Sequence, residues 1–226
     1  MVESISIKRL SADTDPSGSQ WAAVRDLCCR TANDGAAIAA ERWPLFGEIW
    51  IEPYRQLLPD WTYVVLVEER VVGYLTGCPD TASFARRQFV RCTLPLLRHI
   101  VFGRFRGDSY GKRFARQQLG LEKSVARRFP RPVRRQIAAA FPGHLHMNVD
   151  ADYRHGGVGT RLMMQYVDDL RRVQIPGVHL FCGGVAVPFY TRMGFCGLAI
   201  AQVRGHDVHA MGLGLSSLRS HSLDVA

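Results

Sequence analysis

Residues 144–160 read His144-Leu-His-Met-Asn-Val-Asp-Ala-Asp-Tyr-Arg-His-Gly-Gly-Val-Gly-Thr160. The first part alternates, with Leu145, Met147 and Val149 on one side and polar side chains on the other, which is typical of a β-strand. From Val158 to Val173 apolar residues recur at helical spacing, which predicts an amphipathic helix. The local order is therefore strand, glycine-rich turn, helix.

The glycine-rich turn suits an anionic ligand. The first turn of a helix has unpaired N–H groups and the positive end of the helix dipole, so it can hold a phosphate. Gly156, Gly157 and Gly159 have no Cβ, so a phosphate can approach the backbone closely. The pattern Arg154-x-x-Gly157-x-Gly159 matches neither the dinucleotide fingerprint nor the P-loop.

This turn resembles the acetyl-CoA pyrophosphate loop of the GNAT superfamily of N-acetyltransferases. The segment before it, Val149-Asp-Ala-Asp-Tyr-Arg154, is similar to the Val-x-Pro-Glu-Tyr-Arg of that family, with Ala151 at the proline position. Further on, Val187-Pro-Phe-Tyr-Thr-Arg-Met-Gly-Phe195 resembles the second signature, Phe-Tyr-x-x-x-Gly-Phe. The resemblance implies an α/β fold with a GNAT-like mixed, splayed central sheet flanked by helices.

The resemblance also implies acetyl-CoA as co-substrate and a set of cofactor-binding residues. The backbone at the end of the strand would contact the pantetheine arm or the thioester carbonyl, and the turn would wrap the pyrophosphate. The residues are Met147, Asn148, Val149, Arg154, His155, Gly156, Gly157, Val158, Gly159, Thr160 and Arg161. Gly183 stands where many relatives have an asparagine on the pantetheine side, so this contact is missing.

Two catalytic residues are predicted. Tyr190 matches the family tyrosine that protonates the departing CoA thiolate, and a phenol of pKa about 10 can donate to a thiolate whose thiol has a pKa of about 8.5. The alternative is a core tyrosine. His146 is the first candidate for the general base if its strand face meets the acceptor, and a core residue if that face meets helices. Glu48 is the next candidate, although Glu41, Glu48 and Glu52 are interpreted as solvated helix charges.

The remaining elements are predicted from periodicity, and the whole chain, 1–226, is predicted to form one domain. Before the cofactor strand we expect a strand at 4–10, a helix at 20–31, a helical stretch at 45–58 broken at Pro53, and a hairpin of 61–68 with 70–77. After the helix we expect strands at 177–183, 198–203 and 208–215, the last two joined near 205–207, and a frayed tail at 216–226.

An insertion at about 81–140 separates the hairpin from the cofactor strand. It holds 15 Arg or Lys and 2 Asp or Glu, a local charge of +13, whereas the whole chain carries +9. Phenylalanines that anchor helices, with arginines on the surface, are the favoured interpretation. Nucleic acid, an anionic membrane surface or an acidic substrate would also suit a basic and aromatic segment.

Composition narrows the class of protein. No apolar run approaches the roughly 20 residues of a membrane span, and the amino terminus lacks the pattern of a signal peptide, so a cytoplasmic protein is expected. The six cysteines have no zinc or redox spacing, so reduced thiols and no metal are expected.

The acceptor is expected to be an amine on a small molecule or peptide, and the basic insertion suggests an acidic or phosphate-bearing one. A non-catalytic acyl-CoA-binding module is the alternative, and the oligomeric state stays open. A narrower resemblance rests on His144-Leu-His146-x-Asn148 after Phe141-Pro-Gly143, which is similar to the acetyltransferase-like domain of O-GlcNAcases and its bacterial relatives.

Overall fold

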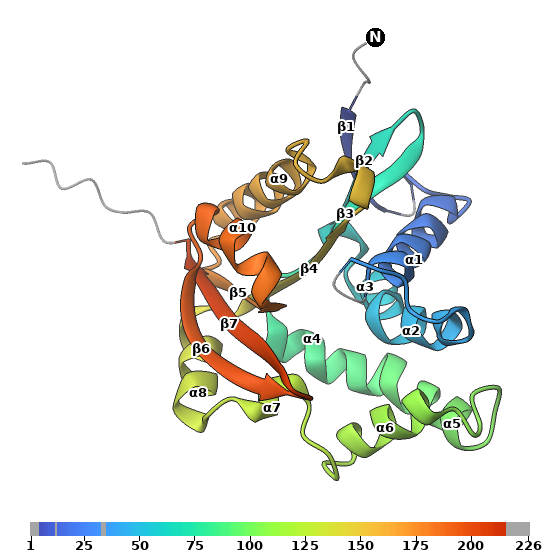
Figure 1. The fold of residues 1–226 in the computed structure, drawn as a ribbon. Coiled ribbons are helices and arrows are strands. Elements are labelled where there is room, and N and C mark those ends of the chain that lie inside the picture. Colours follow the sequence, from blue (N-terminus) through green and yellow to red (C-terminus); the bar gives the residue numbers. More distant parts are fainter. Residues whose placement is uncertain (1–4, 12, 33–34, 216–226) are drawn as a thin grey trace, which may run out of the picture.

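The computed structural model describes residues 5–11, 13–32 and 35–215. Its core is one mixed sheet of seven strands in the order β1-β2-β3-β4-β5-β7-β6 (Figure 1). The β4–β5 pair is parallel and the other neighbours are antiparallel. The strands are β1 (Ile5–Arg9), β2 (Thr62–Val67), β3 (Arg70–Cys78), β4 (Gly143–Val149), β5 (Gly177–Gly183), β6 (Cys196–Val203) and β7 (His206–Gly214).

Helices cover both faces of this sheet, as the α/β prediction requires (Figure 1). Outside the insertion they are α1 (Ser19–Thr31), α2 (Trp43–Trp50), α3 (Glu52–Leu57), α9 (Val158–Arg172) and α10 (Val187–Arg192). Pro53 lies in the first turn of α3, where its missing N–H costs nothing, so the predicted break in this stretch is confirmed.

The two faces are specified by strict alternation along β2, next to β3, in which a register shift interrupts the alternation. Tyr63 and Val65 pack with α9 residues such as Leu162, whereas Val64 packs with Val24 of α1. Because successive strand side chains point to opposite faces, one pair of neighbouring strands supplies both cores. This packing fixes α9 on one side of β4 and α1–α3 on the other.

The sheet splays between β4 and β5. The two strands pair only at Gly143 with Val178 and at His144 with His179. Beyond these pairs, residues 145–149 of β4 bond to β3 alone and present an open backbone edge toward β5. The predicted splay is confirmed, and it ends at the loop that starts α9.

A glycine at the narrow end of the splay allows the strands to close. A Cβ on Gly177 would strike the Ala140 carbonyl oxygen and lie 2.7 Å from Phe141 Cδ1, whereas its register partner Gly214 has open space. We expect Gly177→Ala to lower the free energy of unfolding by about 1–3 kcal/mol, as overpacking does. Gly214→Ala is the matched control. Equal urea midpoints for the two variants would contradict this account.

The insertion is helical, as predicted, and it contains α4 (Thr81–Gln88), a π-helical turn η3 (Phe89–Thr93), α5 (Leu94–Val101), α6 (Ser109–Gln118), α7 (Val125–Arg128) and α8 (Arg131–Ala140). Phe84 stacks on Tyr54 with ring centroids 4.9 Å apart, and Phe129 stacks on Phe181 at 5.1 Å. The predicted anchoring is right for these two phenylalanines. It is wrong for Phe89 and Phe102, which are 44% and 82% exposed.

Smaller differences concern the ends of the chain. β7 begins at His206, so the last hairpin turns at Arg204 and Gly205, slightly earlier than predicted. The predicted frayed tail at 216–226 and the first residue of the strand at 4–10 lie outside the described residues. None of the helices in the described part of the chain has the length and apolarity needed to cross a membrane.

Candidate active site

The glycine-rich turn forms the amino-terminal end of α9. Gly157 is the N-cap with φ 78°, a left-handed conformation that glycine adopts at little cost. The amide of Arg161 donates to the Gly157 carbonyl at 3.0 Å, the first hydrogen bond of the helix. The amides of Val158, Gly159 and Thr160 therefore have no acceptor within α9, and they form a ready anion site.

Gly159 lets α9 approach α10. A Cβ at Gly159 would lie 3.3 Å from Phe189 Cζ and 3.6 Å from Met147 Cε. The turn, the end of β4 and the Phe189 ring thus lie next to one another. From the sequence, this proximity was implied only by the family resemblance. Gly156 and Gly157 are exposed beside them.

Arg154 makes contacts within the protein. Its Nε donates to the Val149 carbonyl at 3.3 Å, and its guanidinium lies against Gly35. These contacts fix the loop to the end of β4. Backbone N–H groups of the turn, more than this side chain, are thus the groups available to an anion.

Asp150 ties the exit of β4 to both neighbouring elements. Its carboxylate accepts from Arg30 of α1 and from Arg70 of β3, each at 3.0 Å. The two arginines hold the pKa of Asp150 below its usual value against the opposing effect of desolvation. The buried carboxylate therefore positions the start of the loop, a role that the sequence analysis missed.

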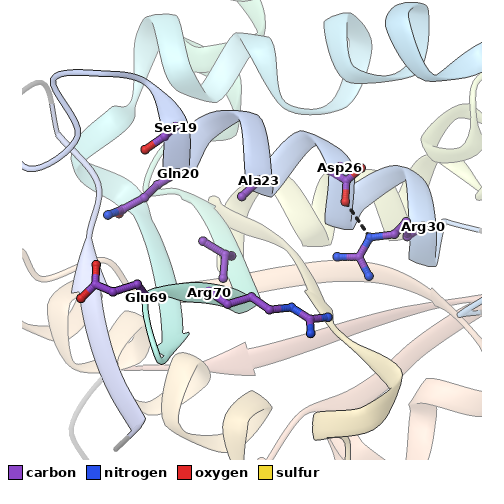
Figure 2. A pocket seen from close by; sticks show the side chains of 8 residues that line it. Ser19, Gln20, Ala23, Asp26, Arg30, Glu69 and Arg70 are labelled. Carbon is purple, nitrogen blue, oxygen red and sulfur yellow. Dashed lines mark hydrogen bonds and ion pairs between the residues drawn. The ribbon is translucent and has the colours of Figure 1, made fainter.

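A crevice of about 290 Å³ lies beside the ion pairs of Asp150 with Arg30 and Arg70, between α1 and the turn of the β2–β3 hairpin. Figure 2 shows Ser19 and Gln20 on one side, Glu69 opposite them, and Arg70 extended toward Arg30. None of the residues predicted to bind the cofactor lines this crevice. Its arginines are engaged by Asp150, and Arg30 also bonds to Asp26.

The polar face of β4 meets α1–α3 and the start of α4. The Thr81 hydroxyl donates to the Pro142 carbonyl at 2.6 Å, so it accepts the Nδ1–H of His144 at 2.7 Å. Nε2 of His144 then accepts from the Tyr54 hydroxyl at 2.7 Å. Both ring nitrogens are satisfied, and burial lowers the pKa of His144 to about 3. His144 is a structural residue.

His146 has one less partner. Its Nδ1 lies 3.3 Å from the Tyr74 hydroxyl, which also accepts from Asn148 at 2.9 Å. The Trp50 ring packs on the imidazole, with centroids 5.4 Å apart. Burial lowers the pKa of His146 to about 4, so the ring is neutral at neutral pH. Within the described residues, no hydrogen bond engages its Nε2.

The lowered pKa values of His144 and His146 predict acid sensitivity. Below about pH 6.5 the unfolded chain takes up protons on these rings while the folded chain does not, so stability falls as the pH drops toward the folded pKa values. At pH 5 the loss is about 2 kcal/mol for each histidine. Urea unfolding at pH 7.5 and pH 5 measures it.

A variant separates these histidines from other titrating groups. His144 and His146 each account for about 2 kcal/mol of the stability lost between pH 7.5 and pH 5. We therefore expect His146→Gln to lose about 2 kcal/mol less than the parent does over this range. His206→Gln, at an exposed position of β7, is the control and should retain the full loss. An unchanged pH dependence in His146→Gln would contradict the proposed burial effect.

Tyr190 lies on the opposite face of β4, in the core formed with α9. Its ring packs edge to face against Phe189 and Phe195, with centroids 5.2 and 5.5 Å away. Burial raises the pKa of the phenol, and the nearby Cys182 adds to the effect. The phenol is therefore protonated at neutral pH. Within residues 5–11, 13–32 and 35–215, the Tyr190 hydroxyl takes part in no hydrogen bond.

Two of the three acidic candidates, Glu48 and Glu52, are engaged by arginines. Glu48 contacts Arg25 at 3.6 Å and Arg104 at 2.8 Å. Glu52 is buried and accepts from Arg55, so its interpretation as a solvated charge was wrong. Glu41 is exposed, as expected.

Comparison with protein-family models gives a match to part of the chain. Residues 134–195, which run from α8 through the loop and α9 to Phe195, match the model of the acetyltransferase (GNAT) family. Over this segment the chain is similar to the GNAT acetyltransferases. The GNAT family resemblance and its fold are thus confirmed.

Solved structures show the same GNAT fold. A crystal structure of SsHAT is 24% identical, with a TM-score of 0.69, over 95% of this chain and all of that one. A putative GNAT-family acetyltransferase from Desulfovibrio desulfuricans is 13% identical, with a TM-score of 0.55, over 94% and 100% of the two chains. The putative acetyltransferase yncA from Salmonella typhimurium, solved with its cofactor acetyl-CoA, is 15% identical, with a TM-score of 0.51, over 98% of each chain.

Proposed function

We propose that this protein is an acetyl-CoA-dependent N-acetyltransferase that moves the acetyl group directly to an amine in a ternary complex. The observation that carries the proposal is the open edge of β4, which leads to the unbonded amides at the start of α9. The acetyl-CoA bound to yncA, which has the same fold, supports this choice of cofactor.

The residues present fit a CoA thioester. Amides of Val158, Gly159 and Thr160 would bind the pyrophosphate, with Arg161 near a further phosphate. The edge formed by Met147, Asn148 and Val149 would pair with the amides of the pantetheine arm, since residues 145–149 have no strand on that side. Exposed His155, Gly156 and Gly157 would complete the loop around the phosphates.

The chemistry proposed for the protein is proton transfer and positioning. Acetyl-CoA supplies an activated acetyl group. Tyr190 would give its phenolic proton to the departing sulfur, because burial keeps that proton in place at neutral pH. His146 would accept the amine proton through its free Nε2, and β4 backbone amides would stabilise charge that develops on the carbonyl oxygen.

A second candidate function is that of a non-catalytic acyl-CoA-binding module. The low basicity of His146 favours this candidate. With a pKa of about 4, His146 accepts a proton from an amine poorly, and Glu48 is held by Arg25 and Arg104. Gly183 also lacks the side-chain amide that many relatives use.

One experiment separates the two candidates. The purified protein is titrated with acetyl-CoA in a calorimeter and then incubated with acetyl-CoA and a panel of small-molecule and peptide amines, including acidic and phosphorylated ones. Thiol release that depends on an amine supports the transferase. Binding without amine-dependent thiol release supports the module, and no binding rejects both.

A further inference from the structure

The insertion exposes an unusual amount of apolar surface. Of thirteen large apolar side chains exposed among the described residues, seven belong to it. They are Phe89, Val90, Leu94, Val101, Phe102, Leu119 and Leu121. Five of the seven lie on one continuous helical segment, α4–η3–α5, or at its end, where Phe102 is 82% exposed. Figure 1 shows this segment running from the middle of the molecule, where α4 begins, out to its edge at α5.

The exposed apolar residues of this segment form a stripe. Val90, Leu94 and Val101 recur at steps of four and seven, which places them on one side of the helix, whereas the half-buried Leu97 packs against the core of Leu96 and Ile100. The opposite side is buried against the protein through Phe84, Leu96 and Ile100. Among the described residues, Val90, Leu94 and Val101 pack into none of the apolar cores, so the stripe that they form is an unpartnered face.

Arginines flank this stripe without acidic neighbours in sequence. Residues 81–107 contain no Asp or Glu. Arg86, Arg87, Arg91 and Arg98 are exposed, and in the part of the chain that the structure describes no ion pair uses any of the four. The apolar face and a free positive charge thus lie on the same segment.

We propose that this face, defined by Val90, Leu94, Val101, Phe102 and the four arginines, docks the protein on an anionic membrane surface. An exposed helix of this composition can insert its apolar side chains about 5–10 Å into the lipid interface. Arginine guanidinium groups pair well with lipid phosphates. The protein binds at the surface and does not span the bilayer.

A lipid surface fits the shape better than a protein segment does. An anchored peptide needs a groove for its side chains. The cavity beside the segment, between α2 and η3 and lined by Gln88 and Cys92, holds only about 10 Å³, the space of roughly one water. A second copy of this face would bring like charges together. A fluid interface needs no preformed pocket.

The test is cosedimentation of the full chain with vesicles of phosphatidylglycerol and phosphatidylcholine, and with phosphatidylcholine alone. We expect the protein to bind the anionic vesicles. This binding should weaken as the salt concentration rises from about 50 to about 300 mM, a range that includes the physiological ionic strength. Arg87→Gln with Arg91→Gln should weaken partitioning about 25-fold, at about fivefold for each arginine. Val90→Glu with Leu94→Glu should abolish it.

Matched variants elsewhere control for general effects. Ile200→Glu replaces an exposed apolar residue of β6, and Arg171→Gln replaces an exposed arginine of α9. Both should bind vesicles as the parent does, and circular dichroism should show all variants folded. The proposal fails if the folded parent ignores anionic vesicles, if the controls weaken binding equally, or if an acidic peptide or DNA binds the stripe and vesicles do not.

Discussion

Tyr190→Phe is expected to lower kcat by about 10²–10⁴-fold with the acetyl-CoA dissociation constant nearly unchanged. The substitution removes one oxygen and retains the ring that packs between Phe189 and Phe195. If the phenol protonates the departing thiolate, its loss affects the chemical step and not the binding of the cofactor. Amine-dependent thiol release and calorimetric titration measure the two quantities separately.

Tyr63→Phe is the matched control for this substitution. Tyr63 is also a buried tyrosine on the α9 face, and its hydroxyl donates to Asp169 at 2.8 Å. Its loss should cost about 1–3 kcal/mol of stability, since Asp169 loses a partner, and should leave kcat unchanged. Full turnover in Tyr190→Phe, or an equal loss of kcat in the two variants, would remove the catalytic assignment.

Gly157→Glu is expected to weaken acetyl-CoA binding by at least about 100-fold, because it places a carboxylate beside the amides that would hold the pyrophosphate. A repulsion and lost contacts worth about 3 kcal/mol are enough for this change. Calorimetric titration of parent and variant measures it. The effect is distinct from that of Tyr190→Phe, which leaves binding in place.

Gly18→Glu is a close control for the backbone cost. Gly18 is the N-cap of α1 with φ 73°, Gly157 is the N-cap of α9 with φ 78°, and a Cβ would meet open space at either position. Both variants should lose about 1–2 kcal/mol of stability from the left-handed conformation. Only Gly157→Glu should lose acetyl-CoA. Parental affinity in Gly157→Glu would refute the proposed phosphate site.

Local patterns were enough to predict the loop and its setting. The strand, the turn and α9 follow one another in the sequence, so periodicity and glycine placement determined them without knowledge of distant residues. The second signature led equally directly to α10, after which Gly194 has a positive φ of 89°, as is common for a glycine at the end of a helix.

Long-range partners could not be predicted in this way. The environment of His144 depends on Tyr54 and Thr81, which lie 90 and 63 residues away in the chain. The engagement of Glu48 by Arg104 joins α2 to the insertion across 56 residues. A single sequence gives the period of each element but not the side chains that tertiary packing brings against it. The paired acids and the neutral histidines therefore emerged only from the structure.

The short junction between β4 and β5 also bears on how the protein opens. Two residue pairs connect the half-sheet β1–β4 to the half-sheet β5–β7–β6, so this seam has the fewest paired residues of any strand boundary among the described residues. Such a seam is where sub-global unfolding costs least. A cofactor lying along the free edge of β4 would act as a short additional strand and close the seam. Amide hydrogen exchange along residues 145–149 would then report occupancy of the site more directly than global melting does.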